Sequence, residues 1–154
     1  MCYSASTMKQ EKAAPADSHI LRQRLEALRK ALLALHKSLV DSERVSYEKN
    51  FGAIQTPNQF LQLLISDPWF AWLQPLSLLI VSMDEALDER KPLTSGNVDA
   101  LSRQCARLLV PQETSEGFPG HYYEAMQRDP DVVLAHAAVV GLTRKSKTRQ
   151  PKKE

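Results

Sequence analysis

Residues 21–39, LRQRLEALRKALLALHKSL, decide the fold class of this chain. Leucine recurs with steps of 4, 3, 4, 3 and 4 residues, at Leu21, Leu25, Leu28, Leu32, Leu35 and Leu39. This spacing places all six leucines on one face of an α-helix. Gly52 is a natural stop, because glycine readily adopts the left-handed conformation that ends many helices. The sequence therefore predicts one long helix over residues 18–51, capped by Asp17 or Ser18.

The composition of the 154-residue chain also favours helices. Leu occurs 21 times, Val and Ile together occur 13 times, and only 5 residues are Gly. A β-sandwich or β-barrel needs β-branched strands and many turns, so this composition argues against both. Two cysteines exclude a disulfide scaffold, and no apolar run reaches the ~18 residues that span a bilayer. We expect an all-α fold without a membrane partner.

Prolines predict most of the other helix boundaries. Thr56-Pro57-Asn58-Gln59 has the pattern of a capping box at the start of a helix over 57–66. Asp67-Pro68 repeats this start and opens an apolar helix over 68–90, in which Pro75 predicts a kink or a break. Further helices are expected at 95–110, 121–128 and 130–141, with a loop over 111–120 and an end at Gly141. The expected architecture is a helical bundle of four main helices plus one or two short helices.

Charge divides the chain into a body and a tail. The formal net charge is +2, but residues 143–154 hold six Lys or Arg and one Glu, a net +5, so the remainder carries about −3. The tail has no apolar side chain to bury and is expected to be disordered. Residues 1–17 are expected to form a flexible arm. The prediction is one domain, 18–142, between the arm 1–17 and the tail 143–154.

Common catalytic and cofactor motifs are absent from the sequence. It contains no G-x-x-x-x-G-K-[ST], G-x-G-x-x-G, G-x-S-x-G, H-E-x-x-H or C-x-x-C, and no Glu followed by His three positions later. We therefore expect no cofactor and no metal, and the balance is against an enzyme. The leading interpretation is a non-catalytic interaction or regulatory module of unknown partner. If Leu21–Leu39 is not covered within the chain, it would pair with a second copy as a helical homodimer.

A polar group follows the leucine face on the same helix. His36, Glu43, Tyr47 and Asn50 lie within about 60° of one another in helical projection. One interpretation is a pocket in which Glu43 is an acid, base or ligand, His36 its partner and Tyr47 a donor. The structural alternatives are a helix end exposed to solvent, or a buried polar network that specifies packing.

Two aromatic segments extend this candidate pocket. Trp69 and Trp72 precede Pro75 and could wall a small-molecule or metal site, or simply fill the core. His121 lies at a loop-to-helix turn and would reach Glu43 if that turn formed a lid; the alternative is an anchored loop. His136 lies on a mostly apolar helix, which favours a hydrogen-bonded residue at the core or its edge.

The basic tail is a third candidate binding region. Its cations are Arg144, Lys145, Lys147, Arg149, Lys152 and Lys153. Spaced cations on a flexible chain can contact phosphates, but no aromatic side chains alternate with them to stack on bases. The tail therefore predicts either non-specific nucleic-acid binding or a solubilising linker.

The N-terminal residues lack the apolar core of a signal peptide, so a cytoplasmic location and reduced cysteines are expected. Three segments, LHKSLVDSERVSYEKNFG, FLQLLISDPWFAWLQPLSLLIVSMDE and YYEAMQRDPDVVLAH, together resemble a family of small uncharacterised bacterial all-helical proteins. The resemblance spans about residues 20–142. It implies a bacterial cytosolic domain with the arm and tail outside the shared region, and it implies no activity, cofactor or partner.

Overall fold

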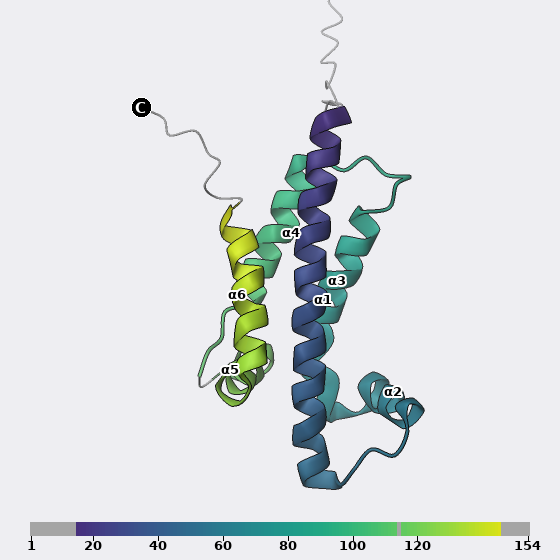
Figure 1. The fold of residues 1–154 in the computed structure, drawn as a ribbon, viewed down its shortest axis with the longest axis vertical. Coiled ribbons are helices and arrows are strands. Elements are labelled where there is room, and N and C mark those ends of the chain that lie inside the picture. The colour runs from purple at the N-terminus through teal and green to yellow at the C-terminus, as the bar shows by residue number, and fades with distance from the viewer. Residues whose placement is uncertain (1–14, 114, 146–154) are drawn as a thin grey trace, which may run out of the picture.

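The structure is a computed structural model that describes residues 15–113 and 115–145 (Figure 1). Within these residues the chain is all-helical and contains no strand, which confirms the predicted fold class. The elements are α1 (Pro15–Phe51), α2 (Pro57–Ser66), the 3₁₀ helix η1 (Pro68–Leu73), α3 (Gln74–Ala86), α4 (Ser95–Leu108), α5 (Phe118–Arg128) and α6 (Pro130–Lys145).

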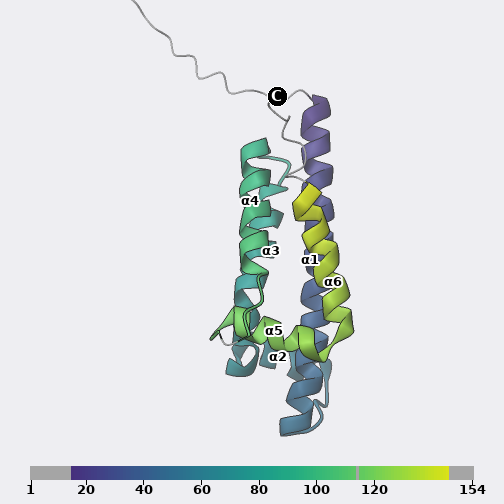
Figure 2. The ribbon, with the colours of Figure 1, turned by 90° about the vertical axis from the view of Figure 1, so that its left-hand side faces the viewer.

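Helix α1 runs along most of the molecule, and the other long helices pack beside it. Its largest interface is with α6, and it also contacts α3 and α4. Figure 2 shows α1 beside α6 and α3 beside α4, with α5 crossing one end. Helix α2 projects from the side of this assembly and contacts mainly η1 (Figure 1). The molecule therefore has a packed body and one short helix attached to its flank.

The leucine face of α1 forms the centre of the core. Leu25, Leu32, Leu35 and Leu39 are fully buried and Leu28 is 4% exposed, while Leu21 is only partly buried. They pack with buried residues of α3, α4, α5 and α6. The leucines from Leu25 to Leu39 are thus covered within the chain. Pairing with a second copy through this seam stays a prediction, because Leu21 is only partly buried.

Two predicted helix starts are confirmed by their hydrogen bonds. Thr56 Oγ1 accepts from the backbone N–H of Gln59 at 3.1 Å, and α2 has the bounds that the capping box predicts. The Gln59 side chain reaches back to the N–H of Gln55 at 3.0 Å, one residue before the expected position. Asp67 Oδ1 accepts from the N–H of Trp69 at 2.8 Å and caps η1.

The predicted helix 68–90 is divided near Pro75, as expected. Residues Pro68–Leu73 form the 3₁₀ helix, and the α-helix begins at Gln74 and ends at Ala86. Pro75 consequently lies in the first turn of α3, where its missing N–H is not needed. The carbonyl of Ala71 accepts from the N–H of Gln74, so the break leaves no free carbonyl there for a ligand.

Several predicted helix ends differ from the structure. Helix α1 begins at Pro15, so Asp17 and Ser18 lie inside its first turn, and α4 ends at Leu108 rather than 110. Helix α5 already begins at Phe118, within the expected loop 111–120. Helix α6 continues past Gly141 to Lys145, because Leu142 is partly buried and Thr143 is buried against the body. The rest of the arm (1–14) and of the tail (146–154) lies outside the described residues.

The segment from Asn50 to Met83 is nearly free of charge, with Asp67 as its one charged side chain. It comprises the end of α1, all of α2 and η1, and most of α3. Among the described residues, no single helix is both long and apolar enough to cross a bilayer; α2 and the following Pro68–Ala86 meet that test only as a pair bent by 69°.

Candidate functional site

A cleft of about 510 Å³ opens between α1, α2, η1 and α3. Its apolar lining includes Val40, Leu64, Ile65, Phe70 and Leu73. Its polar lining consists of His36, Ser66, Asp67, Gln74 and Ser77. This volume lies within the ~300–1,000 Å³ of typical small-molecule sites, which combine an apolar lining with a few polar groups. Because this cleft is larger than the groove of about 280 Å³ between α3 and α4, we take it as the candidate site.

A polar pair joins α1 to α3 inside this cleft. Nε2 of His36 lies 3.0 Å from Oγ of Ser77, and both side chains are partly buried. Burial lowers the pKa of His36 below its ordinary value, so the ring is neutral at pH 7. A neutral imidazole has one donor and one acceptor, and a hydroxyl has one donor and two acceptor lone pairs. Ser77 Oγ also donates to the Leu73 carbonyl at 3.5 Å. The pair thus offers an uncharged hydrogen-bonding group on an otherwise largely apolar wall.

The cleft holds the residue types of a Ser–His–Asp triad without the connections of one. His36 and Ser77 are hydrogen-bonded, but Asp67 Oδ1 accepts from the N–H of Trp69. In residues 15–113 and 115–145, no hydrogen bond joins Asp67 to His36. A triad needs the acid to orient the base. The three side chains therefore do not form a connected triad in this structure.

A second contact joins α1 to α3 beyond the cleft. Arg29 pairs with Asp84, seven residues from His36 on α1 and seven residues from Ser77 on α3. In sequence, Leu33 on α1 and Val81 on α3 fall between these two contacts, and their exposed fractions are 38% and 49%. Two exposed apolar side chains thus occur between the cleft contact and the ion pair.

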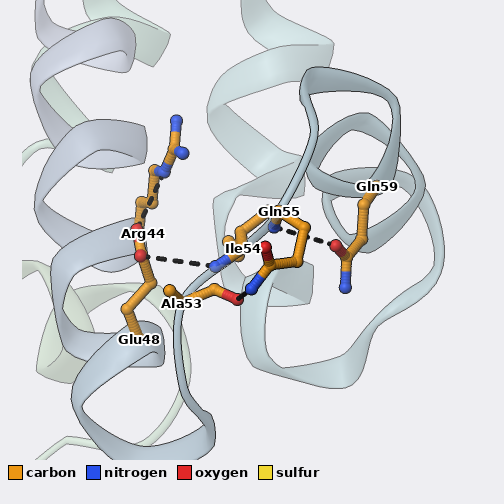
Figure 3. Close-up of polar contacts among 6 residues, drawn as sticks. All are labelled: Arg44, Glu48, Ala53, Ile54, Gln55 and Gln59. Carbon is orange, nitrogen blue, oxygen red and sulfur yellow. Dashed lines mark hydrogen bonds and ion pairs between the residues drawn. The ribbon is translucent and has the colours of Figure 1, made fainter.

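Helix α2 forms the outer wall of the cleft and has no buried residue. Two hydrogen bonds hold the connection between α1 and α2 (Figure 3). Arg44 Nε donates to Glu48 at 2.9 Å, and Glu48 accepts from the N–H of Ile54 at 3.3 Å. The Arg44 guanidinium also lies 4.8 Å from the centre of the Phe60 ring. The wall is therefore attached mainly through half-exposed contacts.

The structure separates Glu43 from His36, although both lie on the same side of α1. Glu43 is buried, and its Oε1 accepts from Arg128 Nη2 at 2.9 Å. The same guanidinium donates from Nε and Nη2 to Oγ of Ser42 at 3.1 and 3.0 Å. Glu43 thus belongs to a buried network between α1 and the end of α5. This arrangement matches the packing-network alternative, and Glu43 does not line the cleft.

Tyr47 and Trp69 join an aromatic cluster below the cleft. The Tyr47 ring centre lies 5.5 Å from that of Phe70 and 6.1 Å from that of Trp69, and Phe51 packs against both Tyr47 and Trp69. Asn50 is exposed, and its Nδ2 donates to the Ser46 carbonyl within the same helix. Of these residues only Phe70 also lines the cleft.

Trp72 and His121 meet at another place, between η1 and α5. Their rings stack with centres 5.3 Å apart and an interplanar angle of 17°, and Phe118 lies 5.4 Å from Trp72. His121 is exposed, and among the described residues no hydrogen bond or ion pair joins it to Glu43, whose partner is Arg128. The buried indole N–H groups of Trp69 and Trp72 have no hydrogen-bond partner in the described ranges. The two tryptophans contribute to packing, and neither lines the cleft.

His136 is hydrogen-bonded at the edge of the core, as its apolar helix predicts. Its Nδ1 lies 2.5 Å from the hydroxyl of Tyr122, which is fully buried. Burial lowers the pKa of His136 and raises the pKa of Tyr122. Burial also raises the pKa of the Cys105 thiol to about 12, so this cysteine is an inert core residue.

The tail candidates fall largely outside the described residues. Arg144 is exposed at the end of α6, and Lys145 closes that helix. Lys147, Arg149, Lys152 and Lys153 are not described. Binding of an anion by the tail stays a prediction.

Sequence reasoning missed the second half of the cleft. Ser77 and Gln74 look like ordinary polar positions of an apolar helix, and Asp67 serves as a cap. Ser77 could have been noticed as a small polar residue within LSLLIV, but only the α1–α3 register brings it to His36. Arg128 was missed because 85 residues separate it from Glu43.

Within the described ranges, no three His, Cys, Asp or Glu side chains gather in a way that could hold a metal ion. Comparison of the chain with protein-family models, with curated proteins and with solved structures finds no match. The cleft's own chemistry therefore carries the functional interpretation.

Proposed function

We propose that this chain is a non-catalytic helical binding module and that the cleft between α1, α2 and α3 takes a small, predominantly apolar molecule. The observation that carries the proposal is the hydrogen bond between His36 and Ser77 within an apolar cleft of about 510 Å³. Such a pair orients a ligand while the apolar walls supply most of the binding free energy. The proposal retains the predicted non-catalytic role and the predicted pocket beside α1. The partner of His36 in that pocket is Ser77 instead of the predicted Glu43.

Titration with N-phenyl-1-naphthylamine, an uncharged dye that fluoresces in apolar surroundings, tests the proposal. The wild type should give a saturable increase in fluorescence. Gln74→Trp places a large ring at the exposed edge of the cleft and should weaken dye binding by about tenfold or more, equivalent to ~1.4 kcal/mol. Unfolding curves of each variant should confirm that the fold is kept.

Gln104→Trp is the matched control, because Gln104 is an exposed glutamine that lines a different, smaller groove of about 280 Å³ between α3 and α4. This variant should bind the dye like the wild type. Absence of saturable binding, or an equal loss in the two variants, would reject the cleft as the binding site. A loss confined to Gln104→Trp would move the site to the smaller groove.

A further inference from the structure

We infer that the cleft selects uncharged amphiphiles, such as molecules with an alkyl chain and one hydroxyl group, over anions of the same length. The inference rests on the proposed function, since it concerns the ligand class of the same cleft. It goes beyond that function by assigning the charge of the ligand and the residues that set it.

The lining contains no cation. Its one formally charged side chain is Asp67, whose Oδ1 already accepts from the N–H of Trp69. Ten of the cleft's twelve lining residues also belong to the segment Asn50–Met83, in which Asp67 is the single charged residue. A carboxylate or phosphate entering the cleft would lose part of its hydration, find no opposite charge and meet a like charge.

The cations nearest in sequence to the α1 wall do not line the cleft. Arg29 is paired with Asp84, and Arg44 is paired with Glu48 while lying over Phe60. Lys37 is exposed. Among the described residues, the lining itself thus includes no arginine or lysine that would neutralise an anionic head group.

The polar pair instead fits an uncharged head group. His36 is neutral at pH 7 because burial lowers its pKa, and Ser77 is a hydroxyl. While bonded to His36, Ser77 Oγ keeps a lone pair that can accept from a ligand hydroxyl. The apolar walls, including Leu64, Ile65 and Leu73, then cover the alkyl chain. Recognition in this form needs no ion pair.

The experiment compares 1-decanol with decanoate at about pH 8, where decanoate is fully ionised, as competitors of the bound dye. Decanol should displace the dye from the wild type at a concentration at least about tenfold lower than decanoate. Because an alcohol also partitions more readily from water than a carboxylate, the decisive readout is the response of decanoate to changes of charge in the cleft.

Gln74→Lys adds a cation at the cleft, and Asp67→Asn removes the anion while keeping a side chain that can cap η1. Each should raise decanoate affinity, by about tenfold for Gln74→Lys, and leave decanol affinity within about twofold. Gln104→Lys, outside the cleft, should change neither. Equal affinity of the wild type for both ligands, or no response of decanoate to either cleft variant, would overturn the inference. Failure of the proposed function looks different, since the dye itself would then not bind in a manner sensitive to Gln74→Trp.

Discussion

The guanidinium of Arg128 at the end of α5 donates to the buried carboxylate of Glu43 on α1 at 2.9 Å. The two side chains are unequally covered, because 7% of the Glu43 side chain and 35% of the Arg128 side chain are exposed. Water can replace a partner for the arginine but not for the glutamate. The two halves of this pair should therefore respond differently to substitution.

Arg128→Met should cost about 3 kcal/mol of unfolding free energy, because it leaves a buried carboxylate without its cation. Glu43→Gln should cost only about 1 kcal/mol, since the amide oxygen can still accept from Arg128. Urea unfolding of the two variants checks this order. Arg24→Met is a control: it breaks a half-exposed pair with Asp99 and should cost less than about 1 kcal/mol. Equal costs for Arg128→Met and Glu43→Gln would contradict the asymmetry.

Two helical glycines should respond in opposite directions to alanine. A Cβ at Gly120 in α5 would overlap the backbone carbonyl oxygen of Ser115, so Gly120→Ala should destabilise the fold by about 2 kcal/mol or more. A Cβ at Gly141 in α6 meets nothing within 4 Å, so Gly141→Ala should stabilise by about 0.5–1 kcal/mol. Thermal unfolding of both variants measures the two signs, and a stabilising Gly120→Ala would show that the chain before α5 is free to move away.

Stability should fall as the pH is lowered through the histidine range. Burial lowers the pKa of His36 and His136 from 6.5 in the folded state, so the unfolded chain binds protons first. Their contribution to stability is therefore complete above about pH 6.5 and is lost as the pH falls toward the lowered values. The groups near them are Ser77 and Asp67 for His36, and Tyr122 for His136.

The measurement is the unfolding free energy between about pH 8 and pH 5. It compares the wild type with a double variant that carries both His36→Asn and His136→Asn. The double variant should show a shallower decline over this range. His19→Asn, on the exposed first turns of α1, should keep the wild-type slope. An unchanged slope in the double variant would mean that other groups dominate this pH range.

Helix α2 should open more easily than the rest of the molecule, because it has no buried residue. Hydrogen exchange should be faster at the amides of α2 than at those of α3, which contains Leu76, Leu79, Ile80 and Met83 in the core. Saturating dye should slow exchange in α2 and leave α4 unchanged. Protection of α2 equal to that of α3 in the free protein would contradict its loose attachment.

Local chemistry made most of the fold predictable. The leucine period marks the core face of α1, and Thr56, Asp67 and Pro75 mark boundaries through hydrogen bonds and a missing N–H that operate within a few residues. The errors occur where tertiary contacts override local signals. Helix α6 runs through Gly141 because Thr143 is still buried against the body.

The candidate site was less predictable, because it depends on contacts between distant segments. His36 was found on the polar edge of α1, but that edge predicts neither Ser77 across 41 residues nor Arg128 across 85. The helical projection grouped His36 with Glu43 because it records direction around the axis. It contains no information about which neighbouring helix each turn meets.

The charge-poor segment has a practical consequence for mapping this protein. No lysine or arginine occurs between Lys49 and Arg90. Trypsin will therefore release α2, η1 and α3 together in one long peptide, Asn50–Arg90, and amine-reactive labels will modify nothing inside it. Chemical footprints that rely on lysine will report on the cleft only from its α1 wall, where Lys37 adjoins His36.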